Sequence, residues 1–164
     1  PDLLDAMRHY WQFFPEGAAI PYCDTPGLWN CRILMAKALE MQYGSKIKID
    51  PEHLAFTVGG CGALQAAFFA IHQHNRKGKL VAIMPFYPQY KVLYGGAARN
   101  RLHPIDVTRT GYRLTAQALN ESLYSIDSSE ISAFVLCDPN NPCSTTAGGE
   151  EWKKIAAILH QYPD

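Results

Sequence analysis

Three short turns in this sequence carry residue types that could bind a ligand. The first is glycine-rich, Gly59-Gly60-Cys61-Gly62, and it precedes a predicted helix. Glycine permits positive φ and close approach, so successive backbone N–H groups at such a helix start can converge on an anion, above all a phosphate. The turn lacks the lysine of a P-loop and fails the dinucleotide pattern G-x-G-x-x-G at Gln65. Glycine-rich connections also occur without any ligand.

The other two turns offer an aromatic surface and a pair of amides. In Pro85-Phe86-Tyr87-Pro88, Tyr87 is held between prolines and presents a flat surface with a polar end. Such a residue suits stacking on a planar heterocycle, although tyrosine also packs well at strand ends. In Asp138-Pro139-Asn140-Asn141-Pro142, Asn141 could bind a phenolic oxygen or a carboxylate, because its amide both donates and accepts. An ordinary proline turn explains the same residues without a ligand.

A short apolar run precedes each turn and predicts a strand. These runs span residues 54–58, 80–84 and 133–137. Residues 101–107 predict a further strand, which Pro104 pushes to a sheet edge. The predicted helices span residues 3–14, 27–43, 63–74, 90–94, 114–125 and 150–161, with Asp50 and Thr115 as predicted N-caps. This alternation predicts an α/β fold with a mostly parallel sheet, whose ligand loops follow the carboxyl ends of the strands.

Composition limits the possible functions. The chain has 164 residues, 48% of them hydrophobic, which is enough for one sizeable core. Fifteen basic residues balance fifteen acidic ones, so neither nucleic acid nor a membrane is an expected partner. The longest apolar runs are far below the roughly 18 residues that span a bilayer, and the first residues do not resemble a signal peptide. Five cysteines without a C-x-x-C pair and scattered histidines predict no metal site and a reducing, cytoplasmic setting.

The order of the three turns is more specific than any one of them. A strand followed by Gly-Gly-x-Gly-Ala-Leu, then one followed by Pro-x-Tyr-Pro, then one followed by Asp-Pro-Asn-Asn-Pro resembles the class I/II aminotransferases. These are fold-type I enzymes that depend on pyridoxal 5′-phosphate (PLP), and the resemblance covers about residues 22–152. It implies a three-layer α/β/α fold. Residues 1–26 would form an N-terminal helix and loop, and residues 27–164 one globular unit, an incomplete PLP-binding large domain.

The resemblance also implies roles for individual residues. Cys61, Gly62 and Ala63 correspond to the turn whose backbone amides hold the cofactor phosphate. Tyr87 corresponds to the aromatic residue that stacks on the pyridine ring. Asn141 corresponds to the asparagine that contacts the 3′ oxygen of that ring and the substrate carboxylate. The three turns would therefore form one wall of a PLP site.

The resemblance further implies a homodimer that transfers an amino group between an amino acid and a 2-oxo acid. Tyr22, in the spacing Tyr-x-x-x-x-Gly that ends at Gly27, corresponds to the tyrosine that reaches the cofactor phosphate of the neighbouring subunit. The family's Schiff-base lysine, its aspartate for the pyridinium nitrogen and its arginine for the substrate carboxylate have no counterpart among these residues. We therefore predict a fragment of a larger enzyme, with no catalytic residue in this chain and no turnover by the fragment alone.

The match departs from the family at Cys143-Ser144, where the family usually has Thr-Gly. Without glycine a positive φ costs more there, and Ser144 or Thr145 is expected to cap the following helix. The family sheet also places three further strands between those predicted at residues 54–58 and 133–137, so a sheet built by this chain alone would have exposed edges. The Asn141-Pro142 bond is a candidate for the cis form.

Other functions use the same scaffold and remain open. One is a PLP-dependent C–S lyase, which would convert a cysteine-like donor into a 2-oxo acid and a thiol. Another is a non-catalytic, aminotransferase-like ligand-sensing domain of a transcription regulator, which an upstream DNA-binding domain would reveal. A degenerate structural copy is a third, and the Cys143-Ser144 departure is its only support.

Overall fold

The computed structural model describes residues 5, 22, 24–44, 46–95 and 101–162. The chain divides into two compact units, Pro1–Thr57 and Val58–Asp164, called here the first and the second unit. This division falls after residue 57, whereas the family resemblance suggested limits of 1–26 and 27–164, which stay a prediction. The helix expected at residues 3–14 lies outside the described residues except for Asp5.

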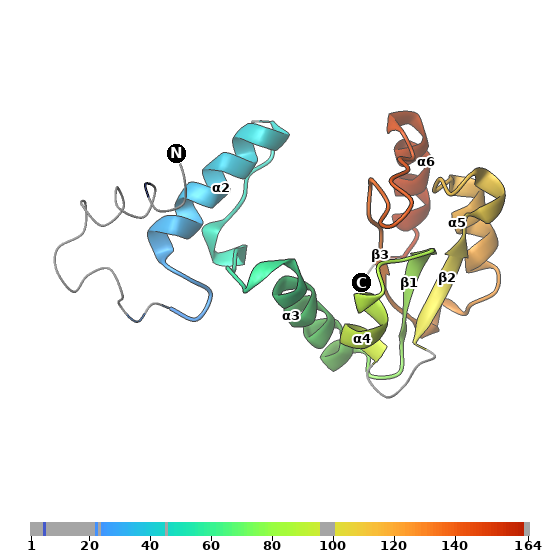
Figure 1. Cartoon of the computed structure of the whole chain (residues 1–164), viewed down its shortest axis with the longest axis horizontal. Helices are drawn as coiled ribbons and strands as arrows, with labels where there is room; N and C mark the ends of the chain where they lie inside the picture. Colours follow the sequence, from blue (N-terminus) through green and yellow to red (C-terminus); the bar gives the residue numbers. More distant parts are fainter. Residues whose placement is uncertain (1–4, 6–21, 23, 45, 96–100, 163–164) are drawn as a thin grey trace. The chain divides into compact units, whose positions relative to one another are not determined.

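Residues 24–44 and 46–57 of the first unit form one long helix and one short 3-10 helix (Figure 1). Helix α2 spans Trp29–Tyr43, two residues shorter at its start than the sequence pattern predicts. The 3-10 helix η1 spans Pro51–His53, and the Asp50 carboxylate accepts a hydrogen bond from the backbone N–H of Glu52, so the predicted N-cap is confirmed. The Arg32 side chain of α2 donates to the Gly27 carbonyl at 3.2 Å and to the Pro51 carbonyl of η1 at 3.1 Å.

The prediction of a strand at residues 54–58 is wrong. Leu54 has an extended backbone, with φ −110° and ψ 134°, but this segment is not part of any sheet. One of its hydrogen bonds runs from the Phe56 N–H to the Pro26 carbonyl at 2.9 Å. An apolar extended segment becomes a strand only when a neighbouring strand pairs with it, and no such neighbour lies among the described residues.

The second unit is built on a three-stranded parallel sheet in the order β2-β1-β3. Strand β1 spans Lys79–Met84, β2 spans Leu102–Asp106 and β3 spans Ile131–Val135. The predicted edge position of Pro104 is confirmed, because it lies in β2 at one edge of the sheet. Strand β3 forms the other edge and begins two residues before the predicted start.

Helices cover both faces of this sheet, which makes the three-layer α/β/α arrangement. Helices α3 (Gly59–His74) and α4 (Gln89–Gly95) lie on one side, and α5 (Ala116–Leu123) and α6 (Gly149–Leu159) on the other (Figure 1). Strand β1 supplies both cores: Leu80 and Ala82 pack with Phe68 of α3, whereas Val81 and Ile83 pack with Ile155 of α6 and its neighbours. Burial on both faces explains why this strand is a continuous apolar run.

Helices α5 and α6 differ in how their N-termini are capped. Thr115 caps α5, and its hydroxyl accepts a hydrogen bond from the Ala118 N–H at 3.1 Å, as predicted. The cap predicted for α6 is wrong, since the N-cap residue is Gly148 and it makes no side-chain hydrogen bond. Thr145 instead donates its hydroxyl to the Tyr112 carbonyl. Two short 3-10 helices, η2 (Thr108–Thr110) and η3 (Ser128–Glu130), lead into α5 and β3.

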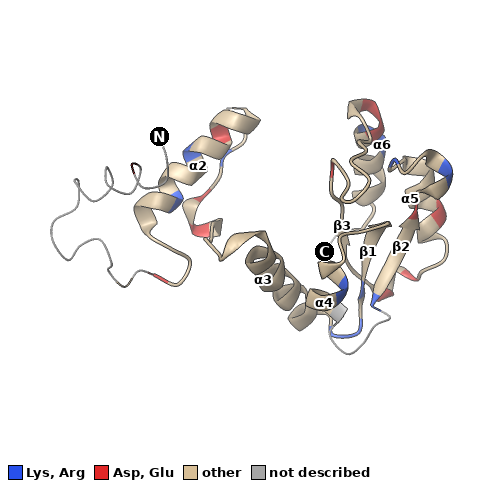
Figure 2. Cartoon of the chain, viewed as in Figure 1, with Lys and Arg blue, Asp and Glu red and all other residues tan. Residues whose placement is uncertain are grey.

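The described helices differ in the charged residues that they carry. Figure 2 shows basic and acidic residues together on α2 and on α6, whereas α3 carries neither. Helix α5 carries one charged residue, Glu121. Within the part of the chain that the structure describes, no helix combines the length and the apolar character needed to cross a membrane. Four described cysteines, Cys31, Cys61, Cys137 and Cys143, are free thiols.

Candidate functional site

The glycine turn forms the first turn of α3, four residues before the predicted helix start. Gly59 begins the helix with φ +67°, a conformation that favours glycine. The N-cap residue Val58 offers no side-chain hydrogen bond. The N–H groups of Cys61 and Gly62 lie in the first turn, where helix geometry supplies no carbonyl partner four residues back. A Cβ at Gly60 would meet no atom within 4 Å, so no neighbouring side chain packs against the turn at that position.

Tyr87 lies against this turn. Its Oη is 3.7 Å from the Cys61 Sγ, although 26 residues separate the two in sequence. This hydrogen bond with the thiol is the main reason that the pKa of the Tyr87 phenol is raised above its ordinary value of 10.0, so the phenol stays neutral at physiological pH. The Tyr87 ring also meets the buried Tyr90 ring edge-on, with centroids 5.8 Å apart. Two contacts therefore fix the half-buried ring after β1.

The loop after β3 is joined to the loop after β1. The Asn140 side chain is buried, and its Nδ2 donates to the Pro85 carbonyl at 3.2 Å. Pro85 lies two residues before Tyr87, and Asn140 precedes the exposed Asn141. Because β1 and β3 are adjacent parallel strands, their carboxyl ends meet at one edge of the sheet, as expected for a ligand site in this class of fold. The three predicted turns are thus linked in series.

The loop that carries Asn141 is held by its own hydrogen bonds. The Asn140 N–H donates to the Thr145 carbonyl at 2.8 Å, and the Ser144 N–H donates to the Asn140 carbonyl at 2.6 Å. Ser144 has φ +53°, so the position where the family has glycine does adopt the left-handed conformation. The Asn141-Pro142 bond is cis, which confirms that prediction. The structure therefore keeps a glycine-type turn without the glycine.

An aspartate and a tryptophan anchor the start of the same loop. The Trp152 Nε1 of α6 donates to the Asp138 Oδ2 at 2.5 Å, and the Ala147 N–H donates to Oδ1 at 3.3 Å. The sequence showed Trp152 only as an apolar residue and Asp138 only as part of the proline turn. Their pairing has no local sequence signal, because fourteen residues separate them.

Tyr22 lies in the first unit and is fully exposed. Its predicted role is across a dimer, so its contact with a cofactor stays a prediction. In the described segment that begins at Asp24, the Gly27 N–H donates to the Asp24 carbonyl at 2.8 Å. The Gly27 carbonyl in turn accepts from the Nε of Arg32 at 3.2 Å.

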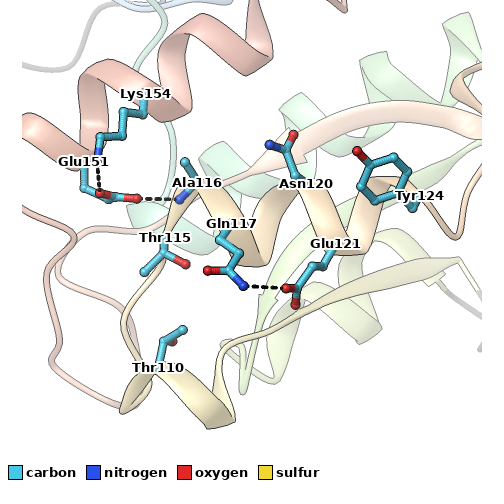
Figure 3. Close-up of a pocket in the computed structure, with 9 residues that line it drawn as sticks. All are labelled: Thr110, Thr115, Ala116, Gln117, Asn120, Glu121, Tyr124, Glu151 and Lys154. Carbon is cyan, nitrogen blue, oxygen red and sulfur yellow. Dashed lines mark hydrogen bonds and ion pairs between the residues drawn. The ribbon is translucent and has the colours of Figure 1, made fainter.

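Two hollows also lie in the second unit, one over α5 and α6 and the other beside the loop after β1. One, of about 660 Å³, runs over α5 and the start of α6 (Figure 3). Its polar groups bind one another: Glu151 accepts from the Ala116 N–H at 2.7 Å and from Lys154 at 3.2 Å, and Gln117 donates to Glu121 at 2.8 Å. The other, of about 240 Å³, is lined by Met84, Pro85, Phe86, Pro88 and Lys91. Neither includes a predicted cofactor residue, and no His, Cys, Asp or Glu group among the described residues forms a metal site.

The layered fold and the three linked loops define a class of protein: an α/β/α domain with a candidate ligand site at the carboxyl edge of a parallel sheet. Residues 17–163 match the family model described as aminotransferase class I and II, and the chain belongs to this family. The PLP dependence of the family makes that cofactor the expected ligand of the site.

Relatives and solved structures agree with this assignment. A 1-aminocyclopropane-1-carboxylate synthase 2 of Solanum lycopersicum is 24% identical over 142 residues, which cover 85% of this chain and 29% of that protein. A 1-aminocyclopropane-1-carboxylate synthase 4 of Oryza sativa subsp. japonica is 25% identical over an alignment of 174 residues, gaps included, which covers 95% of this chain and 35% of that protein. This chain therefore spans about a third of the length of these curated relatives.

The solved structures show the same fold. An amino transferase from Eubacterium rectale superposes with a TM-score of 0.81 at 23% identity, and the match covers 96% of this chain and 38% of that one. A mutant aspartate aminotransferase from Thermus thermophilus gives a TM-score of 0.73 at 21% identity, over 96% and 40% of the two chains. A PLP-bound C-S lyase from Staphylococcus hominis gives 0.64 at 16% identity, over 97% and 39%.

Proposed function

We propose that this chain forms one wall of the PLP site of an enzyme that transfers an amino group between an amino acid and a 2-oxo acid. The observation that carries the proposal is the linkage of the three turns, through Cys61 with Tyr87 at 3.7 Å and Asn140 with Pro85 at 3.2 Å. Family membership supports PLP as the ligand. Our proposal is that the enzyme works as a homodimer, in which Tyr22 of one subunit reaches the cofactor phosphate of the other.

The residues of this wall fit PLP chemically. The N-terminus of α3, where no neighbouring side chain packs at Gly60, suits a phosphate, which the backbone N–H groups of Cys61, Gly62 and Ala63 would hold. A half-buried, neutral Tyr87 offers a ring for stacking on the pyridine. The exposed Asn141 would bind the 3′ oxygen and the substrate carboxylate through its amide. PLP itself supplies the electron sink, while protein residues bind and orient it.

None of the lysines in this chain follows the family's cofactor-lysine motif, so we propose that the chain alone binds PLP without turning over amino acids. The test is to express the 164-residue chain and the full-length protein that contains it, and to assay both with PLP, a panel of amino donors and a 2-oxo acid. Amino transfer by the full-length protein alone supports the proposal. Transfer by the isolated chain contradicts it.

Tyr87→Ala tests the site directly. Loss of ring stacking should weaken PLP binding by the full-length protein by about 0.5–1.5 kcal/mol. The matched control is Tyr124→Ala, since Tyr124 is an exposed tyrosine of the same unit that lies by the hollow over α5, away from the three turns (Figure 3). Equal PLP affinity in the wild type and in Tyr87→Ala would reject the stacking role.

A second candidate is a PLP-dependent reaction that converts an amino acid without transferring its amino group. Its specific support is the name shared by the curated relatives, 1-aminocyclopropane-1-carboxylate synthase. The C-S lyase among the solved structures shows the common fold only. Product analysis separates the two candidates, because amino transfer yields an equimolar pair of a 2-oxo acid and a new amino acid.

A further inference from the structure

Asn140 is buried at the point where two loops of the site meet. Its side chain is 5% exposed, and it is one of three buried polar or charged residues in the described part of the chain. Its Nδ2 donates to the Pro85 carbonyl across a sequence separation of 55 residues. Its backbone is fixed as well, with the N–H bonded to the Thr145 carbonyl at 2.8 Å and the carbonyl bonded to the Ser144 N–H at 2.6 Å.

These bonds connect the two segments that carry predicted ligand residues. Pro85 is two residues from Tyr87, and Asn140 is the immediate neighbour of Asn141. The Tyr87 ring is also held by Cys61 and Tyr90. The single side-chain bond from Asn140 therefore connects a fixed aromatic ring to an exposed amide that is otherwise held by its own loop.

Core packing alone does not account for an asparagine here. A buried amide is costly unless it is hydrogen-bonded, and an apolar residue of similar size would fill the space without that requirement. A buried polar contact that is fully satisfied specifies one arrangement of the groups that it joins. In this case it joins the loops after β1 and β3.

We propose that Asn140 is a positioning residue, which sets the spacing between Tyr87 and Asn141 so that both contact one planar ligand at the same time. This inference rests on the proposed PLP site. Asn140 acts through Tyr87 and Asn141, and its own side chain binds Pro85 and not the ligand.

Asn140→Asp in the full-length protein tests the donor without changing the shape of the residue. An ionised carboxylate only accepts hydrogen bonds, so it cannot bind the Pro85 carbonyl and is repelled by it. We expect PLP affinity, measured by equilibrium binding at neutral pH, to fall about tenfold. As the pH is lowered, the PLP affinity of Asn140→Asp should approach that of the wild type measured at the same pH. A protonated carboxyl can donate to the Pro85 carbonyl again, and burial favours the protonated form.

Three further variants separate positioning from general stability. Asn120→Asp is the matched control, since Asn120 is exposed on α5 (Figure 3). Asn140→Ser removes the reach to Pro85 without adding a titratable group, so we expect a similar loss of affinity without recovery at low pH. Asn140→Ser also tests the proposal if the Asn140→Asp protein does not fold. In a Tyr87→Ala background, Asn140→Asp should cost much less affinity than in the wild type, because the residue that it positions is already gone.

The outcomes distinguish this inference from the proposed function. A wild-type protein that binds no PLP overturns both. A wild-type protein that binds PLP, together with Asn140 variants of unchanged affinity, overturns only the inference. Equal losses for Asn140→Asp with and without Tyr87 also overturn it, because they indicate a general loss of stability. A loss that depends on Tyr87, with recovery at low pH for the aspartate alone, supports it.

Discussion

Replacing Arg32 with methionine tests what holds the first unit together. The Arg32 side chain is 4% exposed, and it donates from Nε to the Gly27 carbonyl at 3.2 Å and from Nη1 to the Pro51 carbonyl at 3.1 Å. The carboxylates of Asp24 and Glu52 are 4.0 and 3.8 Å from its guanidinium nitrogens. One side chain thus joins residues 24–27, helix α2 and helix η1.

The magnitude follows from which of these contacts are exposed. Asp24 and Glu52 are 73% and 67% exposed, so each ion pair should contribute only about 0–1 kcal/mol. A hydrogen bond from a charged donor contributes about 1.5–3 kcal/mol, and Arg32 makes two to backbone carbonyls. Because methionine keeps much of the apolar packing, we expect Arg32→Met to cost about 3–5 kcal/mol, mostly from the lost hydrogen bonds.

Hydrogen exchange of the amides in α2, followed by mass spectrometry in the full-length protein, is the appropriate assay. It reports local opening, whereas a single unfolding curve for a chain of two units does not define one free energy. Arg32→Met should speed exchange in α2 by at least roughly 100-fold. Arg32→Lys should have an intermediate effect, since a lysine ammonium lacks the planar fork that reaches two carbonyls.

The matched control is the double variant Asp24→Asn with Glu52→Gln, which removes both carboxylates and keeps both hydrogen bonds. We expect it to change exchange in α2 by less than about tenfold. If this control matches Arg32→Met, the ion pairs and not the carbonyl hydrogen bonds stabilise the unit, and the reasoning is refuted.

Three further predictions concern single positions. Ser144→Gly should raise the unfolding free energy of the second unit by about 0.5–1 kcal/mol, because φ +53° strains an L-residue; a lower denaturation midpoint would contradict this. Gly27→Ala should destabilise the first unit by about 1–3 kcal/mol in the same exchange assay, since its Cβ would lie 2.8 Å from Phe56 Cδ2 at φ +106°; unchanged exchange would show that Phe56 gives way. The Ala116 N–H is the main group that lowers the pKa of Glu151 below the ordinary 4.5. The ionised Glu151 carboxylate therefore stabilises the fold fully above pH 4.5, and this stabilisation is lost as the pH falls through the folded-state pKa. Glu151→Gln should thus make the free energy of unfolding less sensitive to acid. An identical pH profile in the variant and the wild type would exclude this role.

The sequence predicted most of the second unit because its signals are local. The apolar run in β1 is buried on both faces, and Thr115 caps α5 through the next turn of the chain. Helix α3 starts four residues early, at Gly59, because glycine has low helix propensity and the pattern placed these residues outside the helix. Local helix propensity does not show that a glycine-rich turn can itself form the first turn of a helix.

The contacts that build the site were not predictable in the same way. The turns were recognised as polar and rigid, but the pairing of Cys61 with Tyr87, and of Asn140 with Pro85, spans 26 and 55 residues. Such pairs depend on which strands are neighbours and on which helix covers the sheet. No residue pattern near either partner encodes that arrangement, so only the folded chain shows which of two adjacent asparagines is buried.

The two edges of the sheet differ in a way that has a measurable consequence. Strand β2 carries Pro104 at one edge, which removes a backbone donor and opposes pairing with another strand. Strand β3 forms the other edge without a proline, and all five of its residues are partly exposed. An unpaired, proline-free edge is a template for a further strand.

We therefore expect the 164-residue chain, expressed alone, to self-associate through β3. Sedimentation velocity over a range of concentrations should show association, and hydrogen exchange of the associated form should protect the amides of Ile131–Val135 more than those of Leu102–Asp106. The comparison of two edges within one molecule is its own control, since both belong to the same sheet. Protection confined to β2 would mean that Pro104 does not oppose pairing at that edge, and a monomer at every concentration would mean that an unpaired edge does not drive association. Equal protection of both strands would mean that Pro104 gives β2 no advantage over β3.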